Sequence, residues 1–160
     1  MNVAYVNPFI TGTREVFDAM VKMPFQVGKP RLREPDERLH KLYSVSVVIG
    51  LSGAVSGVLV MSLAEPVALA LATSLSDTPA QALDQDCFDA LAEIANMIAG
   101  SAKKRLPQGQ ISITVPTLLH TEDVIYPNGR PIIALPFDCP FGRFILEISM
   151  ADVPPRAAAA

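Results

Sequence analysis

Two carboxylates and a carboxamide stand at helical spacing in the second half of the chain. Asp89, Glu93 and Asn96 are separated by four and three residues, and Gly100 follows four residues later. Residues at these spacings lie within about 60° of one another, because each residue turns an α-helix by about 100°. The segment therefore predicts a polar ridge that can bind a water molecule or pair with a cation on a partner.

The other side of the same segment is apolar. A helix is predicted over residues 84–106, opened by acidic residues and closed by Lys103, Lys104 and Arg105 before Pro107. The residues predicted to form its buried stripe are Cys87, Leu91, Ile94, Ile98 and Ala102. Such a helix is expected to pack on a core and to leave its polar ridge in solvent.

A solvated helix face is the ordinary interpretation of such a ridge, but two of its residues favour a functional surface. Asn96 is a mediocre helix former, and Gly100 costs about 1 kcal/mol relative to alanine in an exposed helix interior. A glycine on the polar side would also let the backbone of a partner approach closely. We therefore expect a partner to dock on this side of the helix.

Length and composition predict one globular domain, over residues 1–153, with a disordered tail at 154–160. Half of the 160 residues are apolar, and the net charge of −3 gives no electrostatic footprint for nucleic acid. The two cysteines and two isolated histidines have no spacing typical of a metal site. The first residues lack the basic and apolar regions of a signal peptide, so a cytoplasmic protein is expected.

The order of the other elements predicts an α+β fold, a single antiparallel sheet with helices packed on it. Asn7 and Pro8 are expected to begin the first helix, and Ser62 and Glu65 have the spacing of a capping box before the second. Residues 25–41 are expected to be an irregular strand and loop. Helices are predicted at residues 7–23 and 65–75, and strands near residues 111–115, 131–137 and 144–150.

Residues 44–64 carry no charge and leave two interpretations open. The stretch is long enough for a membrane helix, and Gly53 and Gly57 have the spacing of a helix-dimer motif. However, apolar residues recur at every second position over residues 45–51, and Ser52 with Gly53 divides the run. These features favour a β-hairpin with one buried face, and hence no membrane partner.

The chain resembles the CheC, CheX and FliY phosphatases. The motif Asp89-x-x-x-Glu93-x-x-Asn96, followed by Gly100 and later by Pro116 in a strand after an alternating run, is similar to the family signature. The step from Asn96 to Pro116 is a few residues shorter than in the family pattern. The opening segment YVNPFITGTREVFDAM is similar to the first helix of CheX proteins, so the likeness covers residues 5–150. A single motif points to the CheX branch, whose members pair as homodimers through the sheet.

The resemblance implies a phosphatase that dephosphorylates the phospho-aspartate of a CheY-like response regulator. It implies that Asn96 enters the regulator's active site and positions the attacking water, and that Glu93 docks to the regulator's lysine. Asp89 and Gly100 would support docking. The chain itself would bind no cofactor, because the regulator would supply Mg²⁺.

Other interpretations remain open at this point. The main alternative is a non-catalytic module of the same fold that binds a response regulator or a flagellar component. The shortened step from Asn96 to Pro116 keeps this alternative open. A membrane-anchored protein and a purely structural domain are the others.

Overall fold

The uncharged stretch forms a β-hairpin in the computed structural model, which describes residues 3–34, 37, 39–107 and 109–154. Strands β3 (Val45–Gly53) and β4 (Val55–Leu63) pair antiparallel along their whole length. Gly53 ends β3 with a φ of 100°, in the left-handed region that favours glycine. Among the described residues, no helix has the length and apolar character to cross a membrane. The hairpin prediction is confirmed.

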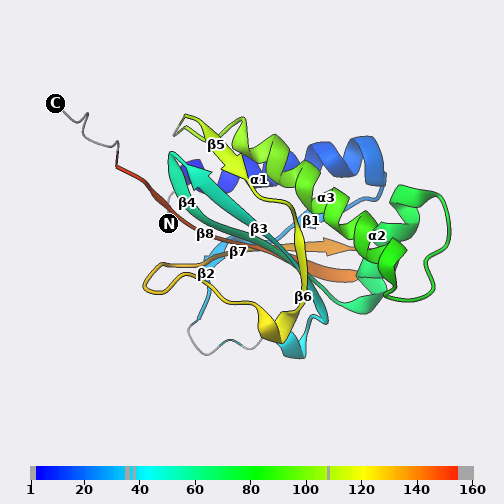
Figure 1. The fold of residues 1–160 in the computed structure, drawn as a ribbon. Helices are drawn as coiled ribbons and strands as arrows, with labels where there is room; N and C mark the ends of the chain where they lie inside the picture. The colour runs from blue at the N-terminus through cyan, green and yellow to red at the C-terminus, as the bar shows by residue number, and fades with distance from the viewer. Residues whose placement is uncertain (1–2, 35–36, 38, 108, 155–160) are drawn as a thin grey trace.

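The hairpin lies within an antiparallel sheet whose strands follow the order β1-β7-β8-β4-β3-β5 (Figure 1). Two short strands complete it, since β2 pairs with β7, and β6 pairs with β3 alongside β5. This confirms the predicted α+β fold and places β4 and β8 at its centre. The remaining bounds are β1 (Gln26–Val27), β2 (Arg31–Leu32), β5 (Ile111–Ile113), β6 (Thr117–His120), β7 (Ile133–Cys139) and β8 (Gly142–Asp152).

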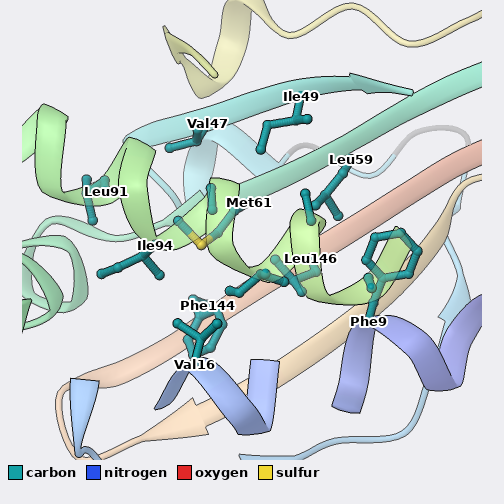
Figure 2. Close-up of a cluster of buried hydrophobic side chains, with 14 of the residues drawn as sticks. Phe9, Val16, Val47, Ile49, Leu59, Met61, Leu91, Ile94, Phe144 and Leu146 are labelled. Atoms are coloured by element: carbon teal, nitrogen blue, oxygen red, sulfur yellow. The ribbon is translucent and has the colours of Figure 1, made fainter. Parts of the chain in front are cut away.

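Three helices cover one face of the sheet (Figure 1). They are α1 (Val3–Val16), α2 (Glu65–Ser76) and α3 (Gln85–Lys103). Helix α3 contacts both of the others and also β3, β5 and β6. Figure 2 shows Phe9 and Val16 of α1 and Leu91 and Ile94 of α3 among buried side chains from the strands. The predicted stripe of α3 is buried in this core, as expected.

The beginnings of the first two helices differ from the predictions. Helix α1 begins at Val3 and contains Pro8, because Val6 is buried in the core and its packing extends the helix beyond the proline. The predicted capping box at α2 is wrong as well. Ala64 precedes α2 with no side-chain cap, and the Ser62 hydroxyl is instead buried in β4, 2.7 Å from that of Ser46.

Irregular segments cover the other face of the sheet. They include η2 (Leu39–Lys41) and η3 (Thr121–Asp123), two single turns of 3₁₀-helix that contact each other. The segment at residues 25–41 also supplies the short strands β1 and β2, in agreement with its irregular appearance in the sequence. Of the predicted tail at 154–160, residues 155–160 lie outside the described residues.

Candidate active site

Helix α3 begins at a well-defined cap. Asp84 precedes the helix with extended backbone, and its Oδ1 accepts a hydrogen bond of 3.0 Å from the backbone N–H of Cys87. The apolar side of the helix then packs on the sheet and on its neighbouring helices. This packing fixes the direction in which the opposite side faces.

The predicted ridge lies on that opposite side. Asp89 and Glu93 are exposed, whereas Asn96 and Gly100 are half-buried. The structure therefore brings all four predicted residues to one helical face, because α3 is a single unbroken α-helix through the motif. This face carries a carboxamide flanked by carboxylates.

The side chains of the ridge differ in their contacts. Asp89 Oδ1 accepts a hydrogen bond of 2.7 Å from Nε2 of Gln85, one turn earlier. By contrast, neither Glu93 nor Asn96 has a side-chain hydrogen bond or ion pair with another of the described residues. The carboxamide of Asn96 thus keeps both its donor and its acceptor for a water or a partner. The Gln85 contact was not predicted, although the i, i+4 spacing of Gln and Asp is a recognisable signal.

Gly12 of α1 and Gly100 of α3 differ in what surrounds them. A Cβ at Gly12 of α1 would lie 3.0 Å from the backbone oxygen of Ile98, so this glycine allows the two helices to approach closely. A Cβ at Gly100 would have no atom within 4 Å. Internal packing therefore explains Gly12 and leaves the choice of glycine at position 100 unexplained by the chain itself.

A polar cluster joins the end of α3 to α1. Glu15 accepts hydrogen bonds from Arg105 and, at 2.5 Å, from the Ser101 hydroxyl, while Arg105 also donates to the Ser101 backbone oxygen at 2.9 Å. The three basic residues at the end of the helix, Lys103, Lys104 and Arg105, therefore differ in their contacts. Arg105 holds the two helices together, whereas no ion pair joins Lys103 or Lys104 to another described residue.

The expectation that Pro116 lies in a strand is wrong. Pro116 lies in a break between β5 and β6. Residue 51 of β3 faces Ile113, and residue 48 faces Thr117. The three residues 114–116 therefore lie opposite the two residues 49–50 of β3, and this one extra residue is typical of a β-bulge. Thr114 keeps the ladder intact, because it donates its N–H to Gly50 at 3.0 Å and accepts from the Gly50 N–H through Oγ1 at 2.9 Å. Pro116 has no N–H to donate, so the bulge suits it. This edge of the sheet contacts α3.

The described residues contain no group of three or more His, Cys, Asp and Glu side chains that could hold a metal ion. The acidic residues of the ridge are strung along one exposed helix, whereas a cation site needs several oxygen ligands that converge. The ridge is therefore suited to hydrogen bonding and ion pairing with a second molecule.

Comparison with known proteins gives a family and a function for relatives. The family model "Chemotaxis phosphatase CheX" matches residues 45–138, which include α3 and most of the sheet. A curated relative, the CheY-P phosphatase CheX of Thermotoga maritima, is 27% identical over 139 residues. The match covers 85% of this chain and 88% of the relative.

Solved structures agree with this match. A chemotaxis protein CheX of Vibrio vulnificus is 25% identical with a TM-score of 0.81, and the match covers 92% of this chain and 99% of that one. The CheX of a CheX–CheY–BeF₃–Mg²⁺ complex from Borrelia burgdorferi is also 25% identical, with a TM-score of 0.76. That match covers 92% of this chain and 98% of the other.

Proposed function

Because this chain belongs to the CheX family of chemotaxis phosphatases, we propose that it hydrolyses the phospho-aspartate of a CheY-like response regulator. The observation that carries this proposal is the free carboxamide of Asn96. It stands on a helix that is fixed to the sheet and to α1, and its neighbour on the ridge is a free carboxylate, Glu93. A rigid element of this kind can place a polar group with the accuracy that catalysis needs.

Hydrolysis of an acyl phosphate needs a water molecule in line with the phosphorus and its leaving oxygen. The Oδ1 atom of Asn96 would accept a hydrogen bond from that water and orient it toward the phosphorus. A carboxamide suits this task because it brings no net charge toward the anionic phosphoryl group. The bond between phosphorus and the aspartyl oxygen breaks as the bond between phosphorus and the water oxygen forms. Inorganic phosphate leaves, and the regulator regains its free carboxylate.

Glu93 would act in docking. It lies three residues before Asn96, about one helical turn away, so it reaches the rim of the same site. We propose that its carboxylate pairs with the lysine beside the regulator's phosphorylation site, and this fixes the register of the complex. Asp89, held by Gln85, would extend the acidic contact by one more turn.

The regulator would supply the Mg²⁺. The complex from Borrelia burgdorferi contains Mg²⁺ and the phosphoryl mimic BeF₃ together with CheX and CheY. The helical ridge described above has no converging ligand set, so the metal is assigned to the regulator's acidic pocket. We also propose that the protein works in the cytoplasm, where response regulators are found.

The Asn96→Ala variant tests the catalytic role. We expect it to lose about 100-fold or more of the acceleration of phosphate release, because the attacking water is no longer oriented. The half-buried side chain has no hydrogen bond with the side chain or backbone of another described residue, so the melting temperature should stay within a few degrees of the wild type. The measurement is phosphate release from acyl-phosphorylated regulator with Mg²⁺. Lys103→Ala, two turns farther along α3, is the matched control, because Lys103 is also half-buried and has no ion pair with another described residue.

The outcome also decides between this proposal and the alternative. If the wild type binds regulators but accelerates phosphate release from none of them, the chain is a binding module of the same fold. The shortened step from Asn96 to Pro116 would then be the first feature to examine.

A further inference from the structure

A cavity of about 360 Å³ lies beside the ridge, between the start of α3 and strand β6. Leu83 and Phe88 line it from the helical side, Leu118 from β6, and Ser44 and Asp123 from the segments next to β3 and in η3. Figure 1 shows β6 crossing the sheet edge between α3 and η3. The proposed function does not use this cavity.

The walls of the cavity are apolar and fixed. Phe88 and Leu118 are half-buried and pack against the main core. Leu118 is also held by the register of the sheet, opposite Val47 of β3. An apolar cavity that is already formed in the free protein suits a side chain that is inserted from outside, because little ordering is needed on binding.

The cavity borders the surface on which a regulator would dock. Phe88 directly precedes Asp89, the first residue of the ridge. Asn96 follows eight residues after Phe88, so it lies about 12 Å farther along the helix at 1.5 Å per residue. A standard interface covers about 800 Å² on each partner, a patch roughly 30 Å across. Eight residues also turn the helix by about 80°, so the cavity lies at the edge of the patch that a regulator centred on Asn96 would cover.

Asp123 of η3 brings an exposed carboxylate to the lining of the cavity, and His120 lines it as well. Asp84 and Asp86, at the start of α3 next to the lining residues Leu83 and Phe88, are also exposed. Among the described residues that line the cavity there is no lysine or arginine. The unpaired Lys103 and Lys104 lie at the opposite end of α3. This end of the surface is therefore complementary to a basic partner segment.

We propose that this cavity is a second contact for the response regulator and receives one of its apolar side chains. The inserted side chain comes from a regulator segment that also places a lysine or arginine against Asp123. This contact rests on the proposed function and deepens it, because it adds a determinant of regulator choice. It contributes affinity and leaves the chemical step to Asn96.

The test uses CheY-like regulators from the same organism, each activated with BeF₃ and Mg²⁺, and measures the Kd by calorimetry. Ser44→Phe fills the cavity from an exposed position and keeps the 2.9 Å bond from the Ser44 N–H to the Leu63 oxygen. We expect it to raise the Kd at least 10-fold, whereas the control Ser44→Ala changes it less than 2-fold. Asp123→Lys should raise the Kd at least 5-fold. Its control is Glu34→Lys, an exposed acidic residue that does not line the cavity.

Each outcome is informative. Unchanged affinity of both Ser44→Phe and Asp123→Lys for a regulator that the wild type binds would overturn the cavity contact and leave the proposed function standing. Because Asp123 is exposed, its variant decides the question even if Ser44→Phe unfolds, which circular dichroism would detect. Binding without dephosphorylation by the wild type would remove the phosphatase and still test the cavity. A wild type that binds no regulator would overturn both.

Discussion

At the scale of single residues, the side chains of Asn96 and Glu93 have no hydrogen bond or ion pair with another described residue. Some polar side chains are used in the structure of the chain itself, as Glu15 and Arg105 are between α1 and α3. On the ridge, a carboxylate and a carboxamide stand one turn apart without a partner among the described residues. Both groups are therefore available to a second molecule, as the proposed function requires.

The variant Glu93→Gln separates docking from chemistry. It keeps the size of the side chain and removes its charge, so the proposed ion pair with the regulator's lysine is lost. We expect KM for the phosphorylated regulator to rise about 10-fold, since charge-assisted hydrogen bonds contribute about 1.5–3 kcal/mol. We expect kcat to fall less than it does in Asn96→Ala. The measurement is steady-state phosphate release at several salt concentrations, and wild-type kinetics in this variant would remove the docking role.

At the scale of elements, one side of α3 packs in the core and the other carries the ridge that we propose for the partner. Gly100 on the ridge side of α3, and Gly12 on α1 where it packs against α3, give a paired prediction. Gly100→Ala should raise the free energy of unfolding by up to about 1 kcal/mol, because the new methyl group meets open space and alanine favours helix. Gly12→Ala should lower it by about 1 kcal/mol, because overpacking against the Ile98 carbonyl exceeds the same helical gain.

Denaturation in urea measures both changes. If Gly100 is there for docking, Gly100→Ala should bind the activated regulator more weakly although it is the more stable protein. A variant that is more stable and binds as well as the wild type would contradict the docking role of this glycine.

Local pattern was enough to predict the elements that position the site. The alternation of residues 45–51 marks β3, and the two-sided pattern of residues 84–106 marks α3. The failures lie where tertiary packing overrides local preference. Pro8 is typical of a helix start, yet the burial of Val6 carries α1 beyond it. Pro116 was placed in a strand, because nothing local reveals that Thr114 keeps the ladder intact through a bulge.

Long-range polar contacts could not be predicted at all. The Glu147 carboxylate is fully buried on β8, where Tyr126 donates a hydrogen bond to it and Nε of Arg33 lies 3.5 Å away. The Arg33 guanidinium also lies over the Tyr126 ring, 4.9 Å from its centroid. These residues come from three separate parts of the chain, and no spacing in the sequence connects them. Together they hold the irregular segments on the second face of the sheet.

The buried carboxylate gives a prediction of pH dependence. Burial raises the pKa of Glu147 above its ordinary value of 4.5, and the Tyr126 hydrogen bond and the Arg33 charge offset this rise only in part. The folded state therefore holds this proton more tightly than the unfolded chain. The stabilising contribution is complete below pH 4.5 and is lost as the pH rises through the folded-state pKa, by up to about 1.4 kcal/mol per pH unit.

Glu147→Gln removes this titration and keeps an oxygen that can accept the Tyr126 hydrogen bond. We expect the unfolding free energy of the wild type, relative to this variant, to fall as the pH rises above 4.5. Urea denaturation between pH 4 and pH 8 measures it, with Glu34→Gln as an exposed control on the neighbouring segment. A constant difference between the wild type and Glu147→Gln over this range would show that folding does not shift the pKa of this carboxyl.

At the scale of the whole molecule, the motif occurs once and the sheet has an open edge. Glu-x-x-Asn is found only at residues 93–96, so each chain offers one ridge of this kind. Within the described part of the chain, β5 and β6 pair with β3 alone, and Val115 between them is 84% exposed. An edge with unpaired backbone groups is a natural place for a second chain to add. The helices and the irregular segments meanwhile cover the two faces of the sheet.

These two features predict the stoichiometry of the working complex. We expect a homodimer, with twice the 17.1 kDa mass of the chain, because pairing through the sheet would satisfy the open edge. Each of its two ridges should bind one activated regulator, so calorimetry should give one regulator per chain, and sedimentation velocity should give the mass of the dimer. A monomeric mass at all concentrations would remove the dimer but leave the one-to-one ratio intact. Two regulators per chain would instead mean that a second docking surface exists, and the assignment of activity to α3 alone would then be wrong.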